Sequence, residues 1–314
     1  MQARAVGGGG RTRGARGALA PGALRLGPLS NVAQIRVALV ANPESGLNTD
    51  RAALEAELRA AGADVLCFDL EQLEDAADWG VDRLVVAGGD GMLGPAARAA
   101  QAAGVPFALL PTGTANDFAR GMGLPLEPAE ACRVAVQGRR TRSLDLARMD
   151  GRPFVNTASV GLSANAADRA VPLKKVIGRF AYMFGAVWAG FTESPVRCRI
   201  VCDGVELFSG KAWQVIVANS GRFGAGSSVE EADPGDGLLD ATVVPAGSRI
   251  ALPRYAYAMR RGRISSAGQA RHGQGCNVRL EVPKQQPYNV DGEVVCQGSA
   301  DFRVERSAAQ IVLG

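Results

Sequence analysis

Histidine is almost absent from this sequence, which holds a single one, His272, in 314 residues. A His-ligated metal site or a Ser-His-Asp triad needs a constellation of groups, so the sequence argues against both classes of enzyme. His272 lies in the Gly-rich run RHGQG and is predicted to be a loop residue. The six cysteines form no CxxC pair and lack zinc-ligand spacing, which favours reduced thiols in a cytoplasmic protein.

Long apolar runs are absent as well. No stretch of about 20 apolar residues occurs, so the sequence predicts no membrane span. The longest candidate, residues 180–191, is predicted to be a core-facing helix, with contact to a membrane surface as the alternative. The phosphate-binding pattern GxxxxGK[ST] is also missing, which argues against a P-loop enzyme.

Acidic residues are missing from the first 31 positions, which carry five arginines. The formal net charge of the whole chain is +4, so the remainder carries −1 and shows no basic stripe of the kind that binds nucleic acid. Residues 1–31 are rich in Arg and Gly and are predicted to be a disordered tail. Nucleic acid is therefore not an expected partner.

Between residues 32 and 138, short apolar runs alternate with helical periodicity. Strands are predicted at 36–41, 64–68, 83–87 and 105–110, and helices at 50–61, 93–103, 116–121 and 127–137. Because each predicted strand is a continuous apolar run, the pattern is typical of a parallel sheet covered by helices on both faces. We expect a doubly wound α/β domain over residues 32–138.

After Gly138 the pattern changes to short strands separated by turn dipeptides such as Asp150-Gly151 and Asp203-Gly204. The predicted strands are 143–148, 154–158, 197–202, 213–219, 239–244, 277–282 and 301–304. They indicate an antiparallel β-sandwich over residues 139–299, interrupted by one predicted helix at 174–191. Residues 300–314 are a candidate segment to rejoin the first domain.

Two glycine-rich loops follow the third and fourth predicted strands. Neighbouring parallel strands end at one edge of a sheet, so these loops should converge on one crevice. Glycines let backbone N–H groups approach an anion, helix N-termini favour negative charge, and threonines add hydroxyl donors. Asp90 would repel a phosphate, so we expect it to act through Mg²⁺ or to position a reacting hydroxyl. The candidate phosphate-binding residues are Gly88, Gly89, Asp90, Gly91, Thr112, Gly113, Thr114, Asn116 and Asp117.

Residues 85–91 (VVAGGDG) and 110–120 (LPTGTANDFAR) resemble the bacterial diacylglycerol kinase-like family, which also includes sphingosine and ceramide kinases. The Gly-Gly-Asp-Gly element alone is shared with NAD kinases and phosphofructokinases, whereas the second run is much more specific to this family. The first loop of the family borders the nucleotide, and it is matched here by Asn42, Ser45 and Gly46. The resemblance covers about residues 35–314 and implies the NAD kinase and diacylglycerol kinase fold.

The resemblance extends to two segments of the second domain. DGLLD at 236–240 is similar to a family segment that holds a structural Mg²⁺, which implies Asp236 as carboxylate ligand and Asp233 and Leu238 as carbonyl ligands. NVDGE at 289–293 casts Asp291 as the base that accepts the proton of a lipid hydroxyl, with Glu293 as its partner. Read from its residues alone, either segment is an ordinary turn.

The sequence departs from the family pattern beside the first loop. The Thr usual after Gly-Gly-Asp-Gly is Met92, and the Asn-Glu that usually follows is replaced by Gly94-Pro95. The lost polar groups weaken the expected phosphate or hydroxyl contacts. A basic residue usual in the loop near position 47 is also missing, which leaves Arg51 or Arg120 to neutralise the nucleotide.

Together these features predict a kinase that transfers the γ-phosphate of ATP, with Mg²⁺, to the hydroxyl of a lipid such as diacylglycerol, in the cytoplasm with peripheral contact to a membrane surface. The alternatives are an NAD-type or other small-molecule kinase and a catalytically inactive nucleotide- or lipid-binding homologue. The presence of Asp90, Asp291 and Glu293 favours activity, because an inactive protein has no need of these carboxylates. The acceptor lipid and the oligomeric state, a homodimer included, stay open.

Overall fold

The structure is a computed structural model, and it describes residues 34–42, 50–162, 194–223, 227–229 and 232–314. The predicted tail at 1–31, the predicted helix at 174–191 and the loop residues Ser45 and Gly46 lie outside the described residues. The chain divides into two units, Met1–Ala33 and Gln34–Gly314, and every described residue belongs to the second.

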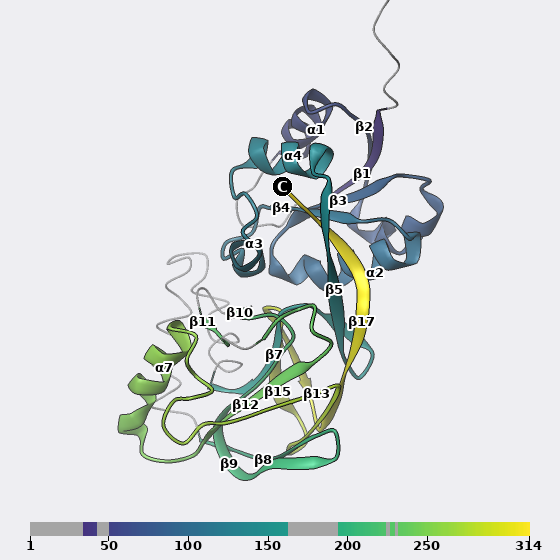
Figure 1. Ribbon diagram of the computed structural model, residues 1–314. Helices are drawn as coiled ribbons and strands as arrows, with labels where there is room; N and C mark the ends of the chain where they lie inside the picture. Colours follow the sequence, from purple (N-terminus) through teal and green to yellow (C-terminus); the bar gives the residue numbers. More distant parts are fainter. Residues whose placement is uncertain (1–33, 43–49, 163–193, 224–226, 230–231) are drawn as a thin grey trace, which may run out of the picture. The chain divides into compact units, whose positions relative to one another are not determined.

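Strands occur throughout this unit, from its first residues to its last (Figure 1). They are β1 (Ile35–Ala41), β2 (Ala63–Phe68), β3 (Arg83–Gly88), β4 (Phe107–Pro111), β5 (Arg140–Met149), β6 (Arg152–Phe154), β7 (Thr157–Gly161), β8 (Val196–Cys202), β9 (Val205–Ala218), β10 (Arg222–Phe223), β11 (Ser227–Ser228), β12 (Leu239–Pro245), β13 (Arg271–Gly275), β14 (Asn277–Glu281), β15 (Gln286–Val290), β16 (Glu293–Gln297) and β17 (Ala300–Leu313).

The helices begin and end at residues with clear local reasons. Asp50 accepts a hydrogen bond from the N–H of Ala52 at the start of α1, and Gly104 closes α2 in the left-handed conformation with φ of 67°. None of the described helices is long and apolar enough to cross a bilayer. They are α1 (Arg51–Ala60), α2 (Leu93–Ala103), α3 (Asp117–Met122), α4 (Pro128–Gln137) and α7 (Leu252–Arg260), with the 3₁₀ helices η1 (Leu70–Asp78), η2 (Asp90–Met92) and η3 (Arg249–Ala251).

The first part of the unit is a three-layer α/β arrangement. Strands β2, β1, β3 and β4 are neighbours in that order and all parallel. One face of this sheet packs on α1 and α4, and the other packs on α2 and η1 (Figure 1). The strands are apolar on both faces because both faces are covered, as the continuous apolar runs predicted.

The second part is mostly antiparallel. Strands β16, β15, β7, β9, β8 and β14 pair in that order, and β12 pairs with β9 and β13. Its interior core combines apolar side chains from these strands with those of β5, β6 and β17. A separate cluster around Trp213 and Ile216 packs against α7. The predicted fold class, an α/β part followed by a β-sandwich-like part, is confirmed.

Strands β5 and β17 connect the two parts. They pair with each other over most of their length, with a register shift between Glu305 and Ala309. At its end, β17 pairs in parallel with β4 through Ile311 and Phe107. The last residues of the chain therefore extend the parallel sheet.

Two predictions of local structure are wrong, and one α-helix was missed. The strand predicted at 154–158 is divided into β6 and β7, because the intervening N–H groups turn toward Asp291 rather than toward a neighbouring strand. His272 lies in β13 instead of a loop, with its Nδ1 3.2 Å from the hydroxyl of Thr242 on the paired strand. Helix α7 was not predicted.

Candidate active site

The two glycine-rich loops touch backbone to backbone. Gly88 at the end of β3 pairs with Pro111 at the end of β4, and the N–H of Thr112 donates to the carbonyl of Gly88 at 3.1 Å. A Cβ built on Gly89 would lie 3.2 Å from Cα of Gly113, and one built on Gly113 would overlap Gly89. Only glycine fits at this contact, so the predicted convergence of the loops is found.

The carboxylate of Asp90 ties the first loop to helix α3. Its Oδ2 accepts the N–H of Asp117 at 3.0 Å, and its Oδ1 accepts the N–H of Phe118 at 2.9 Å. Unpaired N–H groups at a helix start are satisfied in this way by acidic side chains. Asp90 therefore has a structural task in addition to any contact with Mg²⁺ or a hydroxyl.

Asn116 shapes the second loop. It has a left-handed backbone with φ of 51°, and its Nδ2 donates to the carbonyls of Pro111 at 3.1 Å and Gly113 at 2.9 Å. Its buried Oδ1 accepts no hydrogen bond from the described residues. An orphaned buried acceptor is uncommon in native proteins and suits a ligand that donates a proton.

The other predicted nucleotide residues lie along the same edge. Thr112 is buried beside Gly88, whereas Thr114 is exposed. Asn42 follows β1, and its N–H donates to the carbonyl of Ala87 at 3.0 Å. The residues from Asn42, Gly88 to Gly91 and Thr112 to Asp117 thus share one edge of the parallel sheet.

Asp291 sits at the tip of the β15–β16 hairpin. Asp291 and Gly292 form its two-residue turn with φ of 47° and 94°, as type I′ geometry requires. The carboxylate accepts the N–H groups of Val155 at 2.8 Å, Asn156 at 2.9 Å and Thr157 at 2.9 Å.

Two opposing effects set the pKa of Asp291, namely the burial of its carboxyl group and the hydrogen bonds that this group accepts. The residue is half-buried, but its carboxyl group is enclosed. Burial raises the pKa of Asp291 to about 7, the three backbone N–H groups oppose this, and the charge of Asp90 adds to it. A carboxyl with a pKa near neutrality is suited to accept a proton at physiological pH.

Asn156 joins the two aspartates. Its backbone N–H donates to Asp291, and its Nδ2 lies 3.4 Å from Oδ1 of Asp90. Its own Oδ1 accepts the hydroxyl of Ser220 at 2.6 Å, and its carbonyl accepts the N–H of Asn219 at 2.8 Å. Only 2% of Asn156 is exposed, so this bridge is buried.

A cavity of about 160 Å³ opens between the first loop and the hairpin tip. Glu293, whose side chain is 62% exposed, forms an ion pair with Arg152 at this cavity. Arg98 on α2 also lines it, as does Gly91, whose missing Cβ would lie 3.7 Å from Oε1 of Glu293. The side chains of two arginines, Arg98 and Arg152, and two acids, Asp291 and Glu293, therefore line one cavity beside the first loop.

The departures from the family pattern have packing roles. Met92 is buried, and its Cγ would lie 2.5 Å from a Cβ on Gly88. A Cβ on Gly94 would lie 2.9 Å from the carbonyl oxygen of Pro153, so α2 approaches β6 only because a glycine is present. The side chain at 92 faces the core. Pro95 lines the cavity.

The arginines proposed from sequence to neutralise the nucleotide are engaged elsewhere. Arg51 donates to Asp69 at 2.7 Å, and that hydrogen bond raises the pKa of Arg51. Arg120 donates through Nε to the carbonyl of Ala115 at 3.2 Å. Arg98 and Arg152 are the cations that line the cavity instead.

The predicted metal residues fall in one turn before β12. Oδ1 of Asp236 accepts the N–H of Leu238 at 2.9 Å, and the carbonyl of Asp233 accepts the N–H of Asp236 at 3.3 Å. The carboxylate of Asp233 pairs with Arg142 and also accepts the N–H of Gly235 at 2.9 Å.

The donor chemistry of this turn fits Mg²⁺. Carboxylate and carbonyl oxygens are the ligands this ion prefers. Burial raises the pKa of Asp236, and the charges of Asp240, Asp233 and Asp145 raise it further, so a bound cation would relieve the repulsion. The described residues contain no group of three or more His, Cys, Asp or Glu side chains arranged around a metal, so an ion here would rely on carbonyls.

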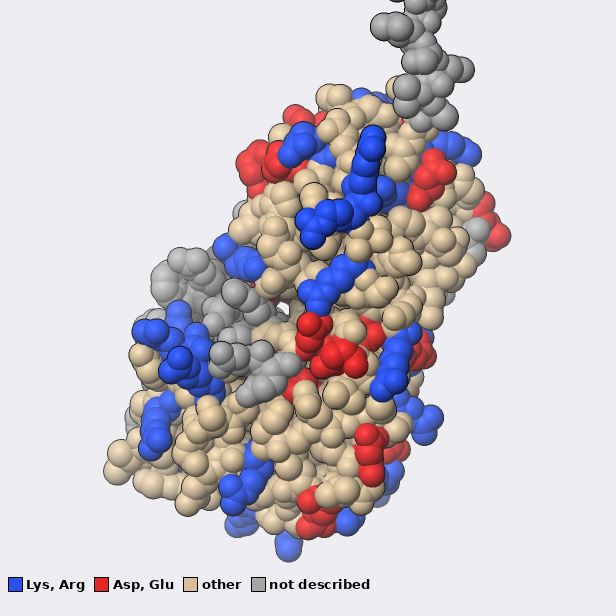
Figure 2. Space-filling view, viewed as in Figure 1, with Lys and Arg blue, Asp and Glu red and all other residues tan. Residues whose placement is uncertain are grey.

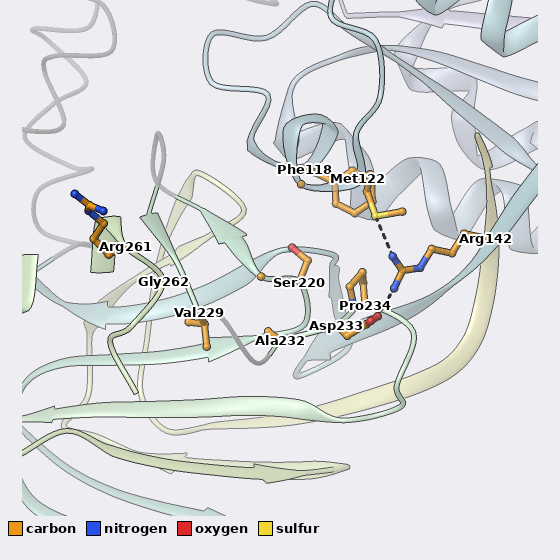
Figure 3. Close-up of a pocket in the computed structure, with 12 residues that line it drawn as sticks. Phe118, Met122, Arg142, Ser220, Val229, Ala232, Asp233, Pro234, Arg261 and Gly262 are labelled. Atoms are coloured by element: carbon orange, nitrogen blue, oxygen red, sulfur yellow. Dashed lines mark hydrogen bonds and ion pairs between the residues drawn. The ribbon is translucent and has the colours of Figure 1, made fainter. Parts of the chain in front are cut away.

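A larger cavity of about 320 Å³ lies beside α3. Figure 3 shows Phe118 and Met122 of α3 facing Ser220, Pro234 and Asp233 across it. Ser220 links this cavity to the aspartate pair, because its hydroxyl donates to Asn156.

The comparisons with known proteins agree with this geometry. Residues 36–149 match the diacylglycerol kinase catalytic domain, and residues 156–313 match the YegS C-terminal NAD kinase beta sandwich-like domain. The chain belongs to the diacylglycerol kinase-like family of lipid kinases. Membership of this kinase family supports a phosphotransferase activity.

Named relatives agree with this family, and a solved structure agrees with the fold. The chain is 28% identical over 294 residues to a diacylglycerol kinase of Mycobacterium tuberculosis, covering 88% of this chain and 94% of that protein. It is 30% identical over 299 residues to a probable lipid kinase YegS-like of Pseudomonas putida, covering 88% and 94%. A putative diacylglycerol kinase from Bacillus anthracis matches in fold with a TM-score of 0.73 at 21% identity, covering 91% of this chain and 99% of that one.

Sequence reasoning missed Asn156, Arg98 and Arg152. Arg98 lies one turn beyond Pro95 on α2, so helical spacing from the first loop could have found it. Asn156 carries no motif of its own. Its importance rests on contacts with residues 66 and 135 positions away.

Proposed function

We propose that this lipid kinase transfers the γ-phosphoryl group of ATP, bound with Mg²⁺, to the hydroxyl of diacylglycerol or a related lipid. The observation that carries the proposal is the meeting of the two glycine loops, at Gly89 and Gly113, beside the Asp291 hairpin tip. A phosphate cradle and a proton acceptor at one cavity are the parts that phosphoryl transfer to a hydroxyl requires.

The loops hold the phosphates in this proposal. Backbone N–H groups of residues 89–91 and 113–114 lie at the edge of the sheet, with no Cβ in the way at the glycines. Arg98 and Arg152 at the 160 Å³ cavity supply positive charge for the transferring group. Mg²⁺ enters with ATP and contributes charge neutralisation at the phosphates.

Asp291 accepts the proton of the acceptor hydroxyl. A carboxylate has about four acceptor positions, and three are taken by backbone N–H groups, which leaves one at Oδ2. Glu293 orients Arg152 through their ion pair. Asp90 keeps α3 in place by accepting the N–H groups of Asp117 and Phe118.

The two parts of the chain divide this work. Residues 32–138, rejoined by 300–314, hold the nucleotide, and residues 139–299 present the lipid to Asp291. Support comes from the pairing of β17 with β4, which returns the chain end to the parallel sheet. The turn at Asp233, Asp236 and Leu238 carries a structural Mg²⁺ in this proposal.

The test is transfer of radiolabelled phosphate from ATP to a lipid extract dispersed in detergent, with the products separated by chromatography. We expect one labelled lipid, and a loss of roughly 10²–10⁴-fold in kcat for Asp291→Asn. Because Asp291 holds three N–H groups, Glu293→Gln is measured beside it; this exposed residue has no such task, and we expect roughly 10–100-fold.

Three results would contradict the proposal in different ways. Labelled NADP or another water-soluble product would make the chain a small-molecule kinase. ATP binding with no labelled acceptor would make it an inactive homologue. Full activity in both variants, with unchanged thermal unfolding, would remove Asp291 from the chemistry.

A further inference from the structure

Helix α7 and its flanks carry arginines without a single acidic residue. Between Asp240 and Glu281 the sequence holds seven arginines and no Asp or Glu. The α7 surface is defined here as Ile250, Arg254, Tyr257, Arg260, Arg261 and Arg263. All six of these residues are exposed. Figure 2 shows Lys and Arg side chains gathered where Figure 1 places α7.

These arginines do not serve internal ion pairs. Among the described residues, Arg254, Arg260, Arg261 and Arg263 form no salt bridge with a carboxylate. By contrast, arginines elsewhere on the surface are paired with acidic side chains. Arg279, for example, lies 2.9 Å from a carboxylate oxygen of Asp301. The charge on α7 is therefore directed outward.

Large apolar side chains accompany this charge. Ile250 is 90% exposed and Tyr257 is 62% exposed, and both belong to the few exposed large hydrophobics of the described chain. The guanidinium of Arg261 lies 5.3 Å from the ring centre of Tyr257, which keeps the ring on the charged face. The opposite side of α7, with Leu252, Tyr255 and Met259, packs on the Trp213 cluster.

We propose that the α7 surface docks on an anionic lipid bilayer. A helix with arginines and exposed Ile and Tyr on one side fits the charged headgroups and the interfacial layer below them. Each basic residue near such a surface contributes about 1 kcal/mol. A nucleic acid would use the arginines but would leave the exposed Ile250 without a partner.

The position of α7 connects this surface to the candidate site. Arg261 and Gly262 at the end of α7 line the 320 Å³ cavity, and Phe118 and Ser220 line its inner side. Docking through α7 therefore sets that cavity beside the bilayer, with Asn156 and the aspartate pair behind it. The inference goes beyond the proposed transfer reaction and stands on charge and exposure alone.

The experiment is cosedimentation of the full chain with vesicles of phosphatidylcholine, with and without phosphatidylglycerol. We expect binding only to the anionic vesicles, weakened by salt. The variant Arg254→Gln with Arg260→Gln should bind roughly 30-fold more weakly. Ile250→Ser with Tyr257→Ser should lose about 10-fold.

The matched control is Arg303→Gln with Lys284→Gln, which removes the same charge from exposed residues outside α7. It should bind within a few fold of the unchanged chain. Equal loss in this control and in the Arg254→Gln, Arg260→Gln variant would mean that net charge alone drives association, and this would overturn the proposal. Absence of binding to anionic vesicles, or equal binding to both vesicle types, would overturn it as well.

Phosphate transfer in detergent separates this proposal from the proposed function. An α7 variant that no longer binds vesicles but still labels a dispersed lipid supports docking. A chain that binds anionic vesicles through α7 and phosphorylates no lipid in either format refutes the kinase proposal alone.

Discussion

Replacing Asn156 by alanine tests how the site is held together. The side chain donates to Asp90 at 3.4 Å and accepts the hydroxyl of Ser220 at 2.6 Å. Alanine removes both bonds and leaves the Ser220 hydroxyl buried without its acceptor. Two lost hydrogen bonds and one unsatisfied group cost about 2–4 kcal/mol in unfolding free energy.

The effect on activity should differ from the effect on stability. Asp90 loses the hydrogen bond from the side chain of Asn156, the residue whose backbone N–H binds Asp291. The two carboxylates are then no longer held in a fixed relative position, so we expect kcat to fall roughly 10–100-fold with little change in KM for ATP. Asn156→Asp should be worse, because it adds a negative charge beside Asp90. That charge should also raise the pKa of Asp291 and move the acidic limb of the pH–rate profile to higher pH.

Asn219→Ala is the matched control. Asn219 is buried next to Asn156 and donates to the carbonyls of Asp145 at 3.1 Å and Val155 at 2.9 Å, but not to the carboxylate of Asp90 or Asp291. Its loss should lower the unfolding temperature without moving the pH limb. If Asn156→Ala and Asn156→Asp keep the pH limb of the unchanged chain and lose only stability, as Asn219→Ala does, Asn156 is structural and the reasoning fails.

Four further predictions concern the loops, the proposed base and the metal turn. Gly113→Ala should weaken ATP binding by pushing the two loops apart. Gly247→Ala should leave it unchanged, because a Cβ at Gly247 meets no atom within 4 Å. Isothermal titration with ATP measures both affinities, and equal affinities would contradict the role of the loop contact. The rate of phosphate transfer should fall as pH drops through about 7, where Asp291 is protonated, and a flat profile from pH 6 to 8 would contradict its role as base. The same raised pKa makes the folded state lose stability as pH rises through about 7, which urea unfolding across this range measures. Mg²⁺ without nucleotide should raise the unfolding temperature of the chain but not of Asp236→Asn, while Asp203→Asn, in a turn far along the sequence, should keep the gain.

The parallel half of the fold could be predicted from sequence because its signals are local. Strands such as β1 and β3 are apolar on both faces, and their residues are buried on both faces in the structure. The loops after β3 and β4 follow from the same rule, since neighbouring parallel strands end together. Turn dipeptides were equally informative, and Asp150 and Asp203 both adopt positive φ.

The remaining features depend on contacts that no short window contains. The strand predicted at 154–158 divides because Asp291, more than 130 residues away, takes its N–H groups. Helix α7 is nine residues long and buries no residue completely, so its apolar face with Leu252, Tyr255 and Met259 is a short signal that the sequence reasoning missed. Arg51 was a candidate to neutralise the nucleotide, but in the structure its side chain forms an ion pair with Asp69.

The structure changes what the acidic residues reveal about activity. From sequence, the presence of Asp90, Asp291 and Glu293 favoured an active enzyme because an inactive one has no use for them. Asp90 holds the start of α3, and Asp291 holds three backbone N–H groups, so a protein without activity would still need both to fold. Glu293 differs, because its side chain is 62% exposed and its described partner is Arg152 at the cavity. Its replacement leaves the fold intact, so Glu293→Gln is the substitution in which a loss of phosphate transfer reports on chemistry rather than on folding.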